Sequence, residues 1–133
     1  MHTTPRAWRA LQMVAVILTA SFLECTDPVT PYVPVVTNAV DNFEYQVPVN
    51  GVTITVRYIW RNTGNAAVVN LLSNVTGGTA TVAITDADGT LVFPHALDGS
   101  GVMGTSGGSS GDWTITVRLS NTIGTVHFTV QKQ

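Results

Sequence analysis

The chain has 133 residues, with eight acidic and six basic side chains and a formal net charge of −2. No basic cluster is present, so nucleic acid and anionic membrane surfaces are excluded as expected partners. Only 11 % of the residues are charged, and Thr, Val, Ser, Asn and Gly are frequent, which indicates an all-β module rather than a helical one.

Residues 1–25 have the layout of an export signal. Arg6 and Arg9 lie in a start without acids, residues 11–23 are almost continuously apolar, and Cys25 follows. The apolar run of about 13 residues is shorter than the roughly 20 that a membrane-spanning helix needs. We therefore expect an exported protein, held in a bacterial cell envelope or secreted.

Cys25 is the only cysteine, so it cannot form an internal disulfide. Residues 22–25 (Phe-Leu-Glu-Cys) resemble the box that precedes a bacterial lipoprotein cysteine, except at Glu24, where a small residue is expected. We expect a lipid on Cys25 and attachment to the membrane through it. The alternative is ordinary signal cleavage near the small residues 19–21.

Residues 26–41 are predicted to be a linker. Pro28, Pro31 and Pro34 recur at every third position, a spacing that favours an extended, semi-rigid chain. The alternative is a first strand interrupted by prolines. The predicted organisation is an export signal over residues 1–25, a proline-rich linker over 26–41 and one β domain over 42–133.

The first strands of the domain are predicted at residues 43–49 and 52–60. Apolar residues alternate in both segments, and Asn50-Gly51 between them is a strong hairpin signal. The expected hairpin pairs the two segments with each other and places their apolar side chains on one face. Pro48 cannot donate a backbone hydrogen bond, so we expect a sheet edge there.

Two further hairpins follow the same logic. Residues 79–85 and 91–93 flank the turn Asp-Ala-Asp-Gly, with Leu91 and Phe93 expected to point inward. Residues 113–119 and 126–130 flank the turn Asn-Thr-Ile-Gly.

Residues 66–72 and 102–105 are predicted to add shorter strands. Seven or eight short strands without a helix indicate an antiparallel β-sandwich of immunoglobulin-like or jelly-roll-like type. The large aromatic residues are expected to dominate its core: Phe43, Trp60, Phe93, Trp113 and Phe128.

Two regions are candidates for contact with a partner. Arg57, Ile59 and Arg61 form an outward row on one predicted strand, for which ordinary edge-protecting charges are the alternative. The segment from Asp98 to Asp112 contains six glycines and is predicted to be a flexible binding loop, with a plain solvated connection as the alternative.

Residues that could carry metal or catalytic chemistry are few. Asp86, Asp88 and Gly89 resemble the start of a calcium loop, but the position that should hold the last carboxylate is Leu97. Calcium at Asp86 and Asp88 is therefore a weak candidate, and a turn explains these residues without metal. No zinc spacing or nucleophile motif is present, so we expect no cofactor and no enzyme.

Two stretches carry a resemblance to a known family. Residues 111–117 (Gly-Asp-Trp-Thr-Ile-Thr-Val) and 124–130 (Gly-Thr-Val-His-Phe-Thr-Val) resemble the ending of bacterial pre-peptidase C-terminal-type β-sandwiches. Residues 42–132 as a whole resemble small bacterial lipoproteins that consist of one such domain. The resemblance implies a secreted, non-catalytic accessory or binding domain.

The predicted function is binding or cell-surface interaction by an exported, lipid-anchored, non-catalytic β-sandwich, with an unknown protein or glycan as partner. One alternative is a structural subunit that assembles by strand addition near Pro48 or along the last strand, residues 125–131. Another is a carbohydrate-binding module that uses an exposed aromatic residue such as Tyr32.

Overall fold

The computed structural model describes residues 31–133, so the predicted export signal and the candidate lipid site at Cys25 lie outside the described residues. The described chain forms seven strands: β1 (Val35–Ala39), β2 (Asn42–Asn62), β3 (Ala67–Leu72), β4 (Asn74–Thr85), β5 (Leu91–Ala96), β6 (Ser100–Gly104) and β7 (Gly111–Lys132). All their pairings are antiparallel. Within this part of the chain, no helix has the length and hydropathy needed to cross a membrane.

A long ribbon of strands centred on β7 organises the fold. One flank of β7 pairs with β2 along its whole length, from Asn42 opposite Gln131 to Asn62 opposite Gly111. Its other flank pairs with β3 and then with β4. Strands of this length would extend about 70 Å if straight.

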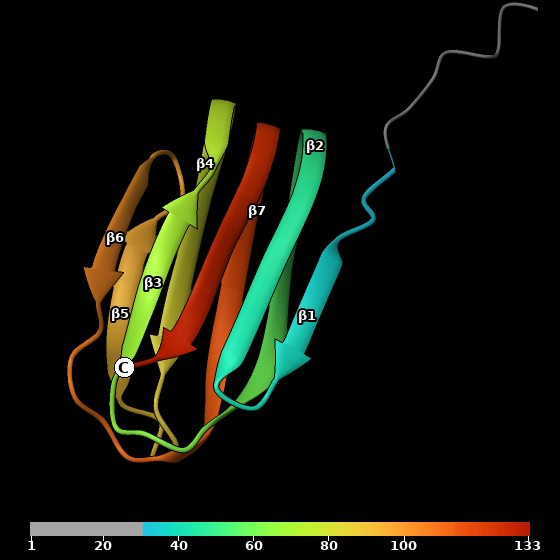
Figure 1. The fold of residues 1–133 in the computed structure, drawn as a ribbon. Helices are drawn as coiled ribbons and strands as arrows, with labels where there is room; N and C mark the ends of the chain where they lie inside the picture. The colour runs from blue at the N-terminus through green and yellow to red at the C-terminus, as the bar shows by residue number, and fades with distance from the viewer. Residues whose placement is uncertain (1–30) are drawn as a thin grey trace, which may run out of the picture.

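The ribbon folds over at its middle, so that its two halves face each other. The rings of Phe43 and Tyr58 lie on opposite halves of β2, yet their centroids are 5.4 Å apart. One layer contains β1, the first half of β2, the second half of β7, β3 and β6 (Figure 1). The other contains the second half of β2, the first half of β7, most of β4, and β5. The predicted antiparallel β-sandwich is confirmed.

Glycines allow the ribbon to bend where it changes layer. Gly51 in β2, Gly78 in β4 and Gly124 in β7 all have positive φ angles, of 74°, 68° and 126°. A Cβ atom on Gly78 would lie 2.1 Å from the carbonyl oxygen of Asn121, and one on Gly124 would lie 2.2 Å from that of Asn74. No side chain fits in these spaces, so close packing of the bend needs glycine at both positions.

Two of the three predicted hairpins are wrong in their pairing. The chain does reverse at Asn50-Gly51, but Val49 pairs with Gly124 and Val52 with Thr122. Residues 113–119 and 126–130 likewise pair with flanking strands, not with each other. A turn between two layers and a turn within one sheet have the same local sequence signal, which explains the error.

The third predicted hairpin, between β4 and β5, is confirmed, with Ile84 opposite Phe93. A register shift beside Thr85 places Val92 in the core and leaves Leu91 52 % exposed. The prediction that Leu91 points inward is therefore wrong, because a bulge changes which face successive side chains reach.

The segment predicted as a linker contributes a strand. Residues 35–39 form β1 and pair with residues 42–46 of β2, so the strand alternative applies to them. This ladder ends at Gln46, two residues before Pro48, which is consistent with the expected edge at the proline.

The core is built around aromatic side chains, as predicted. Trp60 and Trp113 are fully buried and meet edge to face, with ring centroids 6.0 Å apart. Phe43, Phe93 and Phe128 are at most 5 % exposed. These rings join the two layers, so the sandwich depends on them.

Tyr32 packs against this core and is not a free platform for stacking on a sugar. Its hydroxyl group lies 2.8 Å from that of the fully buried Tyr45. Burial, followed by the contact with Tyr32, raises the pKa of Tyr45 well above its usual range. The contact between the two tyrosines therefore holds the segment before β1 against the core of the sandwich.

Candidate interaction surface

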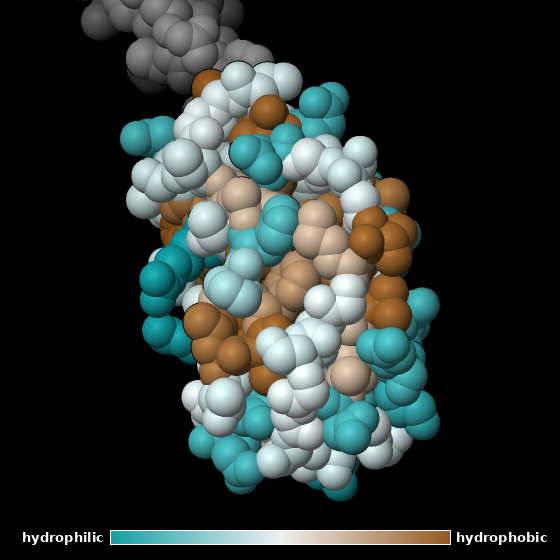
Figure 2. Space-filling view, turned by 90° about the vertical axis from the view of Figure 1, so that its left-hand side faces the viewer, coloured by the Kyte–Doolittle hydropathy of each residue, from teal (hydrophilic) through white to brown (hydrophobic). Residues whose placement is uncertain are grey.

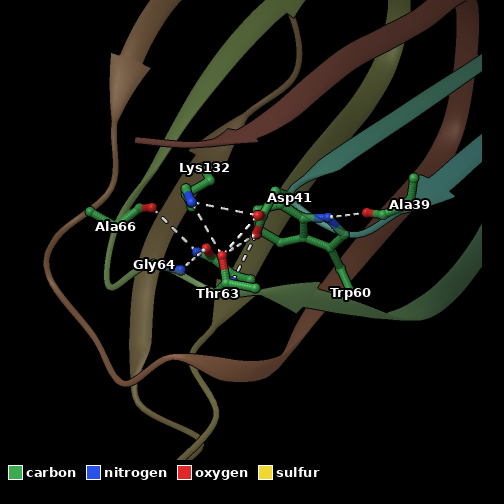
Figure 3. A network of polar contacts seen from close by, with 8 residues as sticks. Ala39, Asp41, Trp60, Thr63, Gly64, Ala66 and Lys132 are labelled. Atoms are coloured by element: carbon green, nitrogen blue, oxygen red, sulfur yellow. Dashed lines mark hydrogen bonds and ion pairs between the residues drawn. The ribbon is translucent and has the colours of Figure 1, made fainter.

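A polar network around Asp41 closes one end of the sandwich (Figure 3). The Asp41 carboxylate accepts hydrogen bonds from the Thr63 backbone N–H at 2.8 Å and from the Thr63 hydroxyl, and Lys132 Nζ lies 3.6 Å away. The hydrogen bonds from Thr63 are the main reason that the pKa of Asp41 is lowered. Because every contact joins the β1–β2 turn to a neighbouring segment of the same chain, the network is structural.

A second polar cluster surrounds Asp86, which is 6 % exposed. One carboxylate oxygen accepts the N–H groups of Asp88 and Thr90 at 3.0 and 2.8 Å, and the other accepts that of Ser109 at 2.9 Å. The Ser109 hydroxyl group donates to Asp88. Both oxygens of Asp86 are thus used by the protein backbone, which supports the interpretation of this loop as a turn.

The structure gives the weak calcium candidate at Asp86 and Asp88 no additional ligands. Over residues 31–133, no group of three or more His, Cys, Asp or Glu side chains is placed to hold a metal ion. A calcium ion takes six to eight oxygen ligands, whereas this loop directs backbone N–H groups at Asp86.

Replacing Asp86 with asparagine is expected to make the stability of the domain depend less on pH in the acid range. Backbone hydrogen bonds, above all from Ser109, lower the pKa of Asp86 below its ordinary 3.8. Its contribution to stability is therefore complete above about pH 4 and is lost as the pH falls through the lowered pKa. Melting temperatures measured between about pH 7 and pH 2 should show a lower value at pH 7 for Asp86→Asn and a shallower acid decline.

The matched control is Asp98→Asn, since Asp98 is exposed and its carboxylate accepts no hydrogen bond within the described chain. This variant should follow the wild-type curve. Identical curves for Asp86→Asn and the wild type would contradict the structural role of Asp86.

The predicted binding loop from Asp98 to Asp112 is more ordered than expected. It contains β6, and the segment after β6 bonds back to the sandwich through the N–H groups of Thr105, Ser106 and Gly108. Asp98 lies near the level of Leu119 on β7, because the N–H of the preceding residue, Leu97, donates to the carbonyl oxygen of Ala80, which lies opposite Leu119. Asp112 belongs to β7 itself, at the level of Arg61. Seven residues of β7 separate these levels, about 23 Å, so the two aspartates do not form one site.

The predicted row of Arg57, Ile59 and Arg61 lies on the outer face of the second layer, and all three residues are exposed. Cross-strand register extends it over the neighbouring strands. Arg118 of β7 lies opposite Thr55 of β2 and Thr81 of β4, and Thr116 lies between Arg57 and Ala83. We call this region the arginine–threonine face; it comprises Thr55, Arg57, Ile59, Thr81, Thr114, Thr116 and Arg118.

The arginines on this side of the molecule differ in their surroundings. Arg61 lies 3.4 Å from the Asp112 carboxylate in an exposed ion pair at the margin of the sheet. Arg57 and Arg118 make no ion pair with any described residue. They occupy diagonal positions on adjacent strands, flanked by short threonines. Their guanidinium groups are therefore available for a partner, whereas that of Arg61 is partly neutralised.

The outer face of the first layer has a different chemistry. Its central contact is between His127 Nε2 and Glu44 Oε2, 2.8 Å apart. The nearby Ser73 hydroxyl bonds to the backbone of His127 rather than to its ring. These residues therefore stabilise strand pairing, and Ser73 is not oriented as a nucleophile.

The side of the sandwich where β5 and β6 lie is shown in Figure 2. Apolar residues on it form separate groups divided by polar ones. The exposed Leu91 of β5 and Val102 of β6 belong to opposite layers. Scattered exposed apolar residues are ordinary on a protein surface, so this side is a weaker candidate for binding.

Sequence reasoning missed Arg118 and the threonines around it. Their signal was present, since Thr114, Thr116 and Arg118 are the outward members of the alternation that places Trp113, Ile115 and Val117 inward. What could not be read locally is that β7 lies beside β2. No protein-family model and no curated protein sequence matches the chain.

Proposed function

We propose that the protein is an exported, lipid-anchored, non-catalytic β-sandwich that binds an anionic partner at the bacterial cell surface. The observation that carries this proposal is the pair Arg57 and Arg118 on the exposed arginine–threonine face, without an acidic neighbour in an ion pair within residues 31–133. Guanidinium groups present forked donors that match carboxylates and phosphates.

The remainder of the molecule supports a binding role. Asp41, Asp86 and Tyr45 have shifted pKa values, and all three form hydrogen bonds with other segments of the sandwich or its turns. The export signal and Cys25 would place the domain outside the cytoplasm, with the segment before β1 as its tether. The resemblance to pre-peptidase C-terminal-type domains favours the same kind of accessory role.

Localisation is tested by the mass of the mature N-terminus and by cell fractionation. We expect a diacylglyceryl adduct on Cys25 and recovery of the protein with the membrane fraction. Cys25→Ser should release it from the membrane. A protein recovered from the cytoplasm with Met1 intact would overturn the localisation.

Binding by the arginine–threonine face is tested by retention of the full chain on a carboxymethyl resin at neutral pH. The chain has a net charge of −2, so retention would require a local basic surface. We expect Arg57→Gln with Arg118→Gln to elute at clearly lower salt, because both unpaired charges are lost.

Arg61→Gln removes one positive charge from the same strand and serves as the control. It should change retention much less, because Asp112 already neutralises part of the Arg61 charge. The single variant Arg57→Gln removes the same charge as Arg61→Gln, and an equal shift for these two variants would show that net charge, and not this face, determines retention.

A further inference from the structure

The second half of β2 forms an open edge of the second layer. Within residues 31–133, β7 is the only strand that pairs with residues 52–62, and it lies on one flank. Residues 42–46 of β2, in contrast, are covered by β1 on one side and by β7 on the other. The last strand, β7, has neighbours on both flanks, so the alternative of strand addition along residues 125–131 is wrong.

Contacts at the end of this edge show which backbone groups face outward. The carbonyl oxygen of Ile59 accepts a hydrogen bond from the Asn38 side chain, and that of Arg61 accepts one from the Asp41 N–H, both from the flank away from β7. Backbone groups two residues apart on a strand point the same way. The N–H and C=O groups of Thr55 and Arg57 therefore point out of the same edge.

The first layer extends one strand further than the second on this side. β1 lies beyond β2 in the first layer, at the right-hand margin of Figure 1, whereas the second layer ends at β2. Val36 of β1 and Tyr32 before it are half-buried and pack against the core. A strand added beside residues 55–57 would lie beneath β1, so small apolar side chains suit its inner face.

Charge determines what suits the outer face of such a strand. A residue directly opposite Arg57 would place its side chain beside that guanidinium group. A residue opposite Thr55 could reach over the short threonine towards Arg118, which lies opposite Thr55 on β7. A second copy of β2 paired symmetrically about Arg57 would bring two Arg57 side chains together, and like charges directly opposite are destabilising. Acidic residues are therefore favoured.

We propose that the open edge of β2 binds an extended segment of a partner protein by strand addition, with acidic side chains outward and small apolar side chains inward. This inference rests on the proposed binding function and gives its partner a chemistry. Main-chain hydrogen bonds to Thr55 and Arg57 would supply affinity, while Arg57 and Arg118 would supply selectivity. Asn38 and Asp41 limit the addition to a few residues before Ile59.

The probe is a labelled, capped peptide of sequence Val-Glu-Val-Glu-Val-Thr, which spans only residues before Ile59, and binding to the full chain is followed by fluorescence anisotropy. In an antiparallel arrangement its two glutamates lie opposite Arg57 and Thr55. N-methylation of both glutamates removes the N–H groups directed at β2 and should weaken binding more than tenfold. N-methylation of the third and fifth residues, both valines, alters only the opposite edge and should leave binding nearly unchanged.

Protein variants test the same contacts. Arg57→Gln should weaken binding of the peptide about tenfold, the effect expected for loss of one charge-assisted hydrogen bond. Arg61→Gln should weaken it less than about twofold, because Arg61 pairs with Asp112 and its edge is covered by Asp41. Thr55→Pro should abolish binding, because proline lacks the outward N–H that the added strand needs. Pro48, earlier in β2, lacks the same group in the native chain.

The outcomes separate this inference from the function on which it rests. Equal loss of binding with either N-methylated peptide overturns strand addition, and this result does not depend on whether Thr55→Pro folds. Retention on the carboxymethyl resin that depends on Arg57 and Arg118, without binding of the peptide, overturns strand addition and leaves the proposed function standing. Concentration-dependent self-association blocked by Thr55→Pro would assign the edge to a second copy and overturn the acidic partner.

Discussion

Gly78→Ala is expected to unfold the domain or to lower its free energy of unfolding by more than about 3 kcal/mol. The new Cβ atom would lie 2.1 Å from the Asn121 carbonyl oxygen and 2.4 Å from that of Ser120. Both obstacles are backbone atoms of β7 at the point where the ribbon changes layer, so no side chain can turn aside. The strand must separate from its neighbour or the bend must open.

Two control variants isolate the effect of close packing. Gly89→Ala, in the β4–β5 turn, meets nothing within 4 Å but has a φ of +82°, so it should lose only about 1 kcal/mol of stability. Gly99→Ala has open space and no such φ angle, so it should be nearly neutral. Chemical denaturation of the three variants gives the order. A Gly78→Ala protein as stable as Gly89→Ala would show that the ribbon does not depend on this contact.

The bend also explains which parts of the fold could be predicted from sequence. The facing of side chains follows a period of two and needs only local information. Accordingly, Phe43, Trp60 and Trp113 were placed inward correctly. Pairing depends on which segments meet in space, and β2 pairs along its whole length with residues 111–131 of β7, far along the chain. A local turn signal at Asn50-Gly51 cannot distinguish a hairpin from a change of layer.

The same distinction applies to the candidate site. The outward direction of Arg57, Ile59 and Arg61 follows from alternation and could be predicted. The difference between Arg57 and Arg61 could not, because it depends on Asp112 lying opposite Arg61 across two strands. The open edge was likewise hidden, since it exists only because β1 covers one half of β2 and not the other.

Trp60→Ala is expected to lower the free energy of unfolding by about 3–5 kcal/mol, the usual cost of removing a large buried ring. Trp60 is fully buried and packs edge to face on Trp113 from the neighbouring strand. Its indole N–H also donates to the Ala39 carbonyl oxygen at 3.0 Å. That oxygen belongs to an exposed residue, so water can replace the donor, and lost packing should account for most of the effect.

The neighbouring residue offers a matched control, because Ile59 and Trp60 point to opposite faces of β2. Ile59 is 60 % exposed, so Ile59→Ala should change stability by less than about 1 kcal/mol. Trp113→Ala should resemble Trp60→Ala, and the double variant should lose about 1 kcal/mol less than the sum, because the ring–ring contact can be lost only once. Strict additivity would mean that the two indoles stabilise the layers independently. A larger loss for Ile59→Ala than for Trp60→Ala would reverse the assignment of inner and outer faces, and with it the exposed position of Arg57 on which the binding surface depends.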